Sequence, residues 1–227
     1  MSEFLAALVS NPAITNALWP AFLETVVMVG ISGLATVLVG LPLGVVLFIT
    51  QPGGLAESRV VNAVLGAVIV NITRSIPYAI LMLTLIPVTR ILVGTSIGPI
   101  GASVSLSIAA IPFFARLVET GLREVHPGKL DAAHAMGSTR LQTVWKVLLP
   151  ESLPSLVASI TTTVVTLIGY SAMAGLIGGG GLGRLAYNYG YQRYQGEVMV
   201  VILIVLVLLV QLVQWTGDRL VRRVDHR

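Results

Sequence analysis

The sequence predicts an all-α integral membrane protein with five transmembrane helices. Of its 227 residues, 55% are hydrophobic and only 11% are charged, whereas a soluble domain carries about 25% charged residues. The mean hydropathy is +0.90, and polar breaks divide the apolar sequence into stretches that approach or exceed the roughly 20 residues a helix needs to cross a bilayer. We therefore expect one membrane domain over residues 1–227.

Each expected span is bounded by residues that interrupt a helix. The segment "QPGGLAESR" ends the first span because Pro and Gly break helices. Pro77, in "NITRSIP", is expected to kink or break the second span, and "VGTSIGPIG" separates the second from the third. A short interfacial helix over 3–10 is a further expectation. The five spans are placed near 21–49, 60–88, 99–116, 153–177 and 198–215.

Positive charge predicts the orientation, since cytoplasmic loops carry an excess of Lys and Arg. With the N-terminus outside, ten such residues fall inside, namely Arg59, Arg116, Arg123, Lys129, Arg140, Lys146, Arg219, Arg222, Arg223 and Arg227. Three fall outside, namely Arg90, Arg184 and Arg193. The N-terminus is therefore expected outside and the C-terminus in the cytoplasm, which requires an odd number of spans. The long loop 117–152 is then cytoplasmic.

The first half of this loop has the pattern of a short helix. Pro127 can open a helix because its missing N–H costs nothing in the first turn. Asp131 stands in the early turns, where a negative charge favours the helix dipole. Gly137 is expected to end the helix, because glycine adopts the left-handed cap conformation without penalty.

A second short helix is expected after Gly137. Thr139 and Gln142 have the spacing of a capping box, and Pro150 disfavours helix at Leu149 and so tends to end it. The residues that fall on one apolar face are Leu141, Val144, Trp145 and Leu148. Two interpretations stay open from the pattern alone: a helix resting on lipid headgroups, or one docking into a groove of a partner.

The loop resembles that of permeases of bacterial ABC importers, which has the form EAA, three residues, G, nine residues, I, one residue, LP. Every spacing is met here, with Asp in place of Glu and Val in place of Ile. In that family the loop docks on a separate ATP-hydrolysing subunit, so the resemblance favours docking. It implies an ATPase-coupling role for Asp131, Ala132, Ala133, Gly137, Val147, Leu149 and Pro150.

Two further segments narrow the resemblance. "GGGGLGRLAYNYGYQRYQGEVM" (178–199) and "NITRSIPYAILM" (71–82) are similar to segments of permeases of methionine importers. Permeases for quaternary amines, osmoprotectants and phosphonates share the glycine run, so that part is less specific. The resemblance implies type I ABC importer architecture and import of methionine, in both the D- and L-forms, across a bacterial cytoplasmic membrane.

The same resemblance implies the partners. The chain would not be an enzyme, since ATP and Mg would be bound by two copies of a partner ATPase. A second copy of the chain would complete the pore, and a periplasmic or lipoprotein solute-binding protein would deliver substrate. The alternatives are an ABC permease for another small solute, such as a quaternary amine or a phosphonate, and an ATP-independent channel or carrier.

Nucleotide, nucleic-acid and metal binding by this chain are not predicted. Gly178, Gly180 and Gly183 satisfy G-x-G-x-x-G, but an apolar helix rather than a strand precedes them, so a flexible or tightly turned loop is expected. No phosphate-binding P-loop motif occurs. The basic residues are scattered and form no basic face. The three histidines, His126, His134 and His226, lack metal-site spacing.

Polar residues inside the apolar stretches are candidates for the translocation pathway. Arg74 lies within an apolar region, where a cation is expensive and is a functional hypothesis by default, unless it snorkels to the interface. Glu24 is expected at the interface. Gly40 and Gly44 form a small-xxx-small step that allows close helix packing. The predicted pathway residues are Asn71, Arg74, Ser75, Tyr170, Ser171 and Met173.

Overall fold

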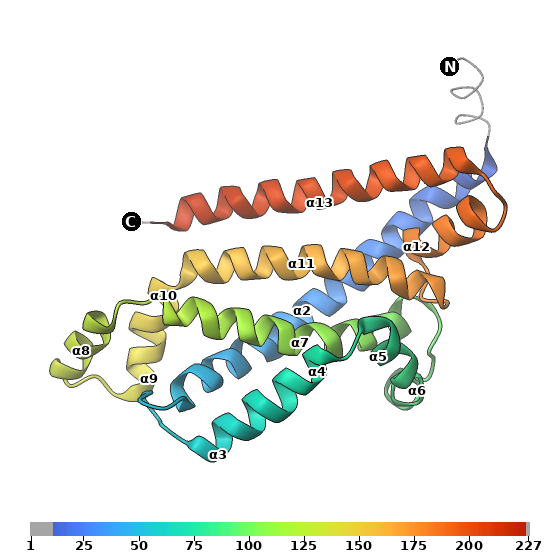
Figure 1. The fold of residues 1–227 in the computed structure, drawn as a ribbon. Helices are drawn as coiled ribbons and strands as arrows, with labels where there is room; N and C mark the ends of the chain where they lie inside the picture. Colours follow the sequence, from blue (N-terminus) through green and yellow to red (C-terminus); the bar gives the residue numbers. More distant parts are fainter. Residues whose placement is uncertain (1–10, 226–227) are drawn as a thin grey trace. The chain divides into compact units, whose positions relative to one another are not determined.

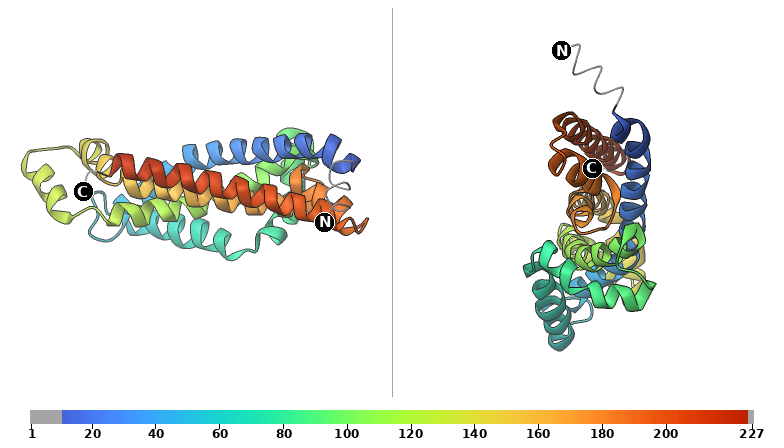
Figure 2. Two further views of the ribbon diagram at one scale, coloured as in Figure 1. Left: turned by 90° about the horizontal axis from the view of Figure 1, so that it is seen from above. Right: turned by 90° about the vertical axis from the view of Figure 1, so that its right-hand side faces the viewer.

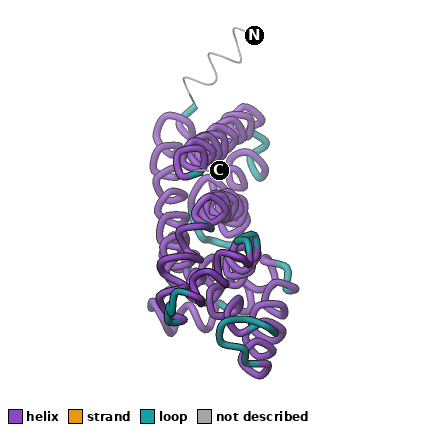
Figure 3. The backbone as a smooth tube through the Cα atoms, turned by 90° about the vertical axis from the view of Figure 1, so that its left-hand side faces the viewer, coloured by secondary structure: helices purple, strands orange, loops and turns teal. Residues whose placement is uncertain are grey.

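A computed structural model describes residues 11–225, and all regular secondary structure in that range is helical (Figures 1 and 3). Among these residues, four helices are long and apolar enough to cross a membrane: Ala13–Thr50, Gly98–Arg123, Leu153–Leu176 and Gly196–Val224. A fifth span results if the bent pair Arg59–Ser75 and Tyr78–Thr84 counts as one. The expected all-α membrane fold is confirmed. The expected helix over 3–10 and the tail residues His226 and Arg227 lie outside the described residues.

The first span is longer than the expected 21–49. It begins as a π-helical segment, η1 (Ala13–Ala17), and continues as α2 (Leu18–Thr50). The side chain of Asn11 accepts a hydrogen bond from the N–H of Ala13 at 2.9 Å, which satisfies one of the free donors of the first turn.

The second span is broken, as expected at Pro77. Three helical pieces lead up to the break: α3 (Arg59–Asn62), the π-helical η2 (Ala63–Asn71) and α4 (Ile72–Ser75). Ile76 has φ −85° and ψ 123°, because the ring of a following proline disfavours helical backbone at the residue before it. After a bend of 100° come α5 (Tyr78–Thr84) and α6 (Ile86–Val93).

The third long helix, α7 (Gly98–Arg123), extends past the expected end at residue 116. The first residues of the predicted loop 117–152 are therefore its last turns. The extension is helical because Val118 and Leu122 are completely buried, and Glu119, at 2% exposure, is ion-paired within the same helix. The rest of the loop forms α8 (Pro127–Ala135), α9 (Arg140–Thr143), the π-helical η3 (Val144–Leu148) and α10 (Leu149–Glu151).

The last part of the chain contains two long helices. α11 (Leu153–Leu176) and α13 (Gly196–Val224) run side by side (Figure 2). Between them in sequence lie a glycine-rich turn, the short α12 (Gly181–Leu185) and the π-helical η4 (Ala186–Tyr191).

The described chain divides into two compact units, each assembled from three separate segments. One unit, here called unit 1, takes residues up to Leu34, Pro77–Ile108 and Val164–Val213. The other, unit 2, takes Ala35–Ile76, Ala109–Thr163 and the residues from Gln214 onward. Four of the five boundaries fall inside the long helices α2, α7, α11 and α13, and the fifth falls between Ile76 and Pro77 at the break of the second span.

Each unit has its own apolar core. In unit 1, the start of the first span packs against α12 and the start of α13, through Ala13, Ala21, Leu182, Leu185, Val198 and Ile202. In unit 2, the end of α2 packs against α7, η3 and the start of α11, through Phe48, Phe114, Val118, Leu122, Val125, Val144, Leu148 and Leu156. The loop 117–152 is thus anchored by apolar side chains in unit 2.

The glycine step in α2 is a site of close helix contact within unit 2. A Cβ on Gly44 would lie 2.6 Å from the carbonyl oxygen of Ala115 and 2.6 Å from the Cβ of Val118. A Cβ on Gly40 would lie 2.9 Å from a ring carbon of Phe114. Small residues of this kind allow helix backbones to approach each other, so the predicted close packing occurs here between α2 and α7 of one chain.

We predict that Gly44→Ala lowers the stability of the purified protein. The new methyl group would overlap backbone that cannot move aside easily, and such overpacking costs about 1–3 kcal/mol. Gly30→Ala in the same helix is the matched control, because nothing lies within 4 Å of a Cβ there and alanine is the better helix former. Thermal unfolding in detergent measures both; equal midpoints for the two variants would contradict the contact.

Candidate functional site

The residues that resemble the ABC permease motif begin on α8. His126 caps this helix, its Nδ1 accepting from the N–H of Gly128 at 3.1 Å, and Pro127 is the first helical residue, as predicted. Asp131 and Ala132 are exposed, whereas Ala133 is 1% exposed. The helix therefore has one side anchored in unit 2 and another open to a partner.

Gly137 ends α8 as expected, with φ +77°. The N–H of Ser138 donates to the carbonyl of Ala133 at 3.1 Å, which satisfies a carbonyl that the helix end leaves free. Thr139 then caps α9, and its side chain and that of Gln142 form the predicted reciprocal capping box.

The predicted apolar face of the second loop helix is divided in the structure. Val144 and Leu148 are buried in the core of unit 2, but Leu141 is 68% exposed and Trp145 is 65% exposed. Met136, before the turn, is 78% exposed. The helical period alone did not reveal this division, because η3 is π-helical and its wider turn moves Trp145 out of the α-helical register, while Leu141 lies on α9, before that turn.

The expectation that Pro150 ends the second helix is wrong. Leu149 has helical backbone, φ −65° and ψ −47°, and α10 continues through Pro150 to Glu151. Proline clashes with the carbonyl four residues earlier in an α-helix, and the wider π-helical turn directly before Leu149 provides the room. Val147 and Leu149 are half-buried, and Pro150 is exposed.

Two polar contacts hold the loop to the helices around it. The ammonium of Lys129 on α8 pairs with the carboxylate of Glu151 on α10. The hydroxyl of Ser155 on α11 donates to the carboxylate of Glu124, which follows α7. Both contacts lie in unit 2: the first ties α8 to α10 at the end of the loop, and the second ties the residue after α7 to the start of α11.

A buried carboxylate connects the end of α7 to the broken span. Glu119 accepts hydrogen bonds from Arg116 Nη1 at 2.6 Å and from Arg123 Nη2 at 2.5 Å. Arg116 also donates from Nη2 to the side-chain oxygen of Asn71 at 2.6 Å. Sequence reasoning used the two arginines only for orientation; their three- and four-residue spacing from Glu119 was the available signal for helix ion pairs.

The predicted pathway residues of the broken span lie at its break. Asn71 ends η2 and is held by Arg116. Ser75 donates to the carbonyl of Asn71 at 2.9 Å, within its own helix. Arg74 is exposed, and its guanidinium has no ion pair or hydrogen bond to the described part of the chain. These three residues belong to unit 2.

The other predicted pathway residues belong to unit 1. Tyr170 stacks on Tyr78 with ring centroids 4.5 Å apart, and the hydroxyls of Tyr78 and Ser105 are 3.3 Å apart. Ser171 is buried and donates to the carbonyl of Ile168 at 2.7 Å, while Met173 is 41% exposed. Sequence reasoning missed Tyr78, although it follows Pro77 at the break.

The glycine run forms a tight turn that packs on α2. Gly178, Gly180 and Gly181 all have positive φ, and a Cβ on Gly183 would lie 2.1 Å from the carbonyl oxygen of Ala172. The turn is completed by side chains of α2, described next. No side chain larger than hydrogen fits at Gly183 without displacing α11.

Glu24 and Thr25 of α2 cap the start of α12. Glu24 Oε2 accepts from the N–H of Gly181 at 2.6 Å, and Thr25 Oγ1 accepts from the N–H of Leu182 at 2.9 Å. In the structure Glu24 is half-buried and satisfies one backbone donor of another segment; its placement at the membrane interface stays a prediction.

Together, the candidate spans, the broken span, the capped glycine turn and the two-sided helical loop define an all-helical protein of the multi-pass membrane class. The chain belongs to the binding-protein-dependent transport system inner membrane component family, whose sequence model matches residues 40–226.

Named relatives cover most of the chain. It is 52% identical over 213 residues to the probable D-methionine transport system permease protein MetI of Vibrio cholerae. This alignment covers 94% of each chain. It is 45% identical over 181 residues to the methionine import system permease protein MetP of Bacillus subtilis. This alignment covers 80% of this chain and 81% of the relative.

Solved structures have the same fold. An inward-facing conformation of the MetNI methionine ABC transporter matches with a TM-score of 0.89 and 48% identity over 92% of this chain and 96% of the matched chain. An amino acid ABC transporter crystallised with histidines matches with a TM-score of 0.77 and 19% identity, over 97% of this chain and 98% of that one. The second likeness concerns the fold alone.

We predict that Glu119→Gln destabilises the protein by about 1–3 kcal/mol, because charge-assisted hydrogen bonds are lost from a buried group. The effect is limited because Arg116 and Arg123 are partly exposed, at 29% and 55% of their side chains, so water replaces part of what they lose. Thermal unfolding in detergent measures it. Glu57→Gln is the control, since Glu57 is exposed, pairs with Arg59 at 3.7 Å and accepts from the N–H of Gly53 at 3.2 Å, which glutamine can also do; an equal loss in both variants would be the contrary result.

Proposed function

We propose that this chain is the permease subunit of an ATP-driven ABC importer that moves methionine, in its D- and L-forms, into the cytoplasm. The observation that carries the proposal is the 52% identity, over 94% of both chains, to a probable D-methionine permease. The match to the MetNI methionine transporter at 48% identity supports the same solute. We further propose that two copies of the chain form the pore, with two copies of an ATPase that binds ATP and Mg.

The loop would couple the ATPase to the membrane segments. The exposed side of the loop presents the large apolar side chains of Met136, Leu141 and Trp145. Aromatic residues and methionine are enriched at protein interfaces. Its buried side is fixed in unit 2 through Val144 and Leu148. A push on α8 or η3 would therefore move α7 rather than bend a flexible loop.

Within unit 2, the buried ion pairs extend this coupling toward the predicted pathway. α8 follows α7 directly, and Arg116 of α7 holds Asn71 at the end of η2. A displacement of α7 would then shift the piece of the broken span that carries Arg74. In this proposal Asp131, Ala132, Ala133, Gly137, Val147, Leu149 and Pro150 contribute to the coupling element, and Asn71, Arg74, Ser75, Tyr170, Ser171 and Met173 to the pathway or its packing.

The orientation follows from charge. We propose the N-terminus outside and the C-terminus in the cytoplasm, because ten of the Lys and Arg residues then lie inside and three outside. The exposed loop would face the ATPase in the cytoplasm. A solute-binding protein, periplasmic or lipid-anchored, would deliver substrate from the other side.

We predict that Trp145→Ala weakens co-purification of the ATPase in mild detergent without unfolding the permease. Truncating an exposed tryptophan anchor at an interface costs about 2 kcal/mol, or roughly thirtyfold in affinity. Trp215→Ala is the matched control, since Trp215 is 55% exposed on α13, outside the loop. Equal retention of the ATPase by both variants would contradict the role of Trp145 as an interface anchor.

A stronger disruption tests the whole loop. The double substitution Asp131→Arg and Gly137→Trp reverses an exposed charge and forces a bulky side chain onto φ +77°, a conformation that costs about 1–2 kcal/mol for residues other than glycine. We expect the ATPase to be lost from the complex. An ATPase that stays bound to this variant would contradict the coupling role of the loop, and so would an ATPase that fails to co-purify with the unaltered chain.

We predict that cells carrying this chain and its partners take up labelled methionine, and that cells lacking the chain do not. Competition with unlabelled D-methionine should reduce the uptake, because both enantiomers are proposed substrates. Labelled quaternary amines and phosphonates serve as the comparison solutes. Uptake of a quaternary amine or a phosphonate in place of methionine would contradict the proposed solute and leave the permease assignment intact.

A further inference from the structure

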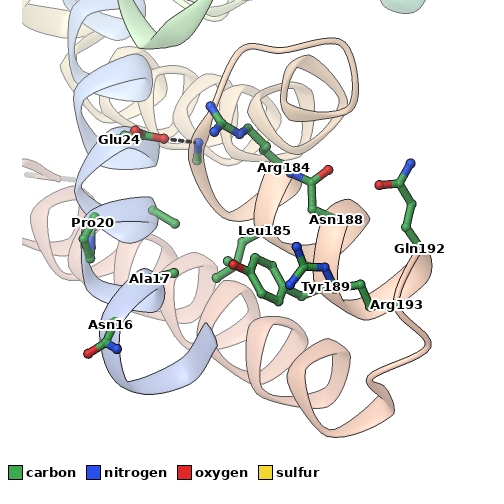
Figure 4. Close-up of a pocket in the computed structure, with 12 residues that line it drawn as sticks. Asn16, Ala17, Pro20, Glu24, Arg184, Leu185, Asn188, Tyr189, Gln192 and Arg193 are labelled. Carbon is green, nitrogen blue, oxygen red and sulfur yellow. Dashed lines mark hydrogen bonds between the residues drawn. The ribbon is translucent and has the colours of Figure 1, made fainter. Parts of the chain in front are cut away.

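Unit 1 contains a polar cavity that neither the loop nor the predicted pathway uses. Its volume is about 620 Å³, and it lies between the first turns of the first span and the segment α12–η4 (Figure 4). Its polar lining includes Asn16, Glu24, Arg184, Asn188, Tyr189 and Arg193. Asn16, Arg184 and Arg193 are exposed in the cavity, so water or a ligand can reach them, whereas Glu24, Asn188 and Tyr189 are half-buried and need hydrogen-bond partners.

The described chain supplies few of those partners. The side chains of Asn16, Arg184 and Asn188 make no hydrogen bond or ion pair with residues 11–225. Arg193 lies over the ring of Tyr189, its Cζ atom 4.3 Å from the centroid. Figure 4 shows the guanidinium groups of Arg184 and Arg193 turned toward the helix that carries Glu24.

Glu24 has one oxygen in use and one available. Oε2 accepts from the N–H of Gly181 at 2.6 Å, and Oε1 has no partner in the described part of the chain. The cavity therefore offers two cationic donors on one side and one free carboxylate oxygen on the other. Ala17, Pro20 and Leu185 supply apolar wall between them.

Both walls of the cavity contain π-helical backbone. Asn16 and Ala17 come from η1, and Asn188 and Tyr189 come from η4. Single turns of π-helix are rare and occur frequently at functional sites, because the wider turn reorients side chains. The widened turns therefore coincide with the polar groups that have no partner.

The charges select the ligand. A simple anion would meet the two arginines but also the free oxygen of Glu24, and a simple cation would meet Glu24 but also the arginines. A group with both a negative and a positive charge can interact favourably with the arginines and with Glu24. Arg binds carboxylate or phosphate through paired N–H donors. We propose that this cavity binds a zwitterion with a primary ammonium close to an anionic group, the anion toward Arg184 and Arg193 and the ammonium toward Glu24.

Two sources carry this chemistry, a free α-amino acid and the headgroup of phosphatidylethanolamine. Exposed aromatic residues lie nearby in the chain: Trp19 of α2 and Tyr191 of η4 are each 65% exposed, and Tyr194, between η4 and α13, is 90% exposed. Trp and Tyr are enriched where a membrane meets water, so both a dissolved amino acid and a lipid headgroup reach this position. The proposal does not depend on methionine being the transported solute.

The test uses the purified full-length chain in detergent with its ATPase. Native mass spectrometry measures retention of phosphatidylethanolamine, phosphatidylcholine and phosphatidylglycerol added at equal concentration, and equilibrium dialysis measures binding of labelled L-methionine. Phosphatidylcholine is the matched lipid probe, because its quaternary ammonium has no N–H to donate. Phosphatidylglycerol carries the anion without any ammonium.

The variants are Arg184→Gln, Arg193→Gln and Glu24→Gln, with Arg90→Gln as the control. Arg90 is exposed, lies outside this cavity and donates to Ser96 at 3.1 Å. Glutamine at position 24 can still accept from Gly181, so the α12 cap is kept while the charge is lost. Each arginine variant should weaken the zwitterion about tenfold, as expected for one charge-assisted hydrogen bond, and Glu24→Gln should turn the preference toward phosphatidylglycerol.

The outcomes separate the sources. Suppose that phosphatidylethanolamine is retained better than phosphatidylcholine, and that this preference is lost in the arginine variants but kept in Arg90→Gln. The ligand is then the lipid headgroup. Methionine binding with the same variant pattern identifies the amino acid. Equal retention of all three lipids without methionine binding, or equal losses in Arg90→Gln and Arg184→Gln, would overturn the site. Because these are binding measurements, a failure of methionine uptake in cells leaves them unaffected.

Discussion

The constraint on which the rest of this structure depends is that hydrocarbon offers no hydrogen-bond partner to a peptide group. Every interruption of a membrane helix must therefore be satisfied inside the protein. At the glycine turn, Glu24 and Thr25 of α2 accept from the N–H groups of Gly181 and Leu182. The broken span leaves helical geometry only at Ile76 and Pro77, between α4 and α5, so few backbone groups lose their helical partners.

The same constraint explains where the charged residues of the spans are found. Glu24 accepts from one backbone donor, and Glu119 is 2% exposed and bound by two arginines. An isolated carboxylate in such surroundings would be very costly, and both of these are hydrogen-bonded to donors of another segment or turn. Each carboxylate thereby connects two segments: Glu24 links the glycine turn to α2, and Glu119 links the end of α7 to Asn71 through Arg116.

The π-helical segments of the described chain coincide with the places where function is proposed. η2 leads into the broken span, η3 carries Trp145 in the loop, and η1 and η4 form the walls of the polar cavity. A π-helical turn is wider than an α-helical one and changes which side chains share a face. In η3 such a turn separates Trp145 from Val144 and Leu148, and it accommodates Pro150 in a continuing helix.

The sequence by itself determined the membrane class, the positions of the long helices and the caps of the loop. These features depend on local chemistry: runs of apolar residues, the effect of Pro77 on Ile76, the left-handed backbone of Gly137 and the reciprocal bonds of Thr139 and Gln142. Only the tertiary structure decided which face of the loop is buried, that Tyr78 stacks on Tyr170 and that Glu119 is paired with two arginines. It also brought Glu24, Arg184 and Arg193 to one cavity. These residues are far apart in the chain or lie on turns whose period departs from 3.6, and no local pattern specifies which segments pack together.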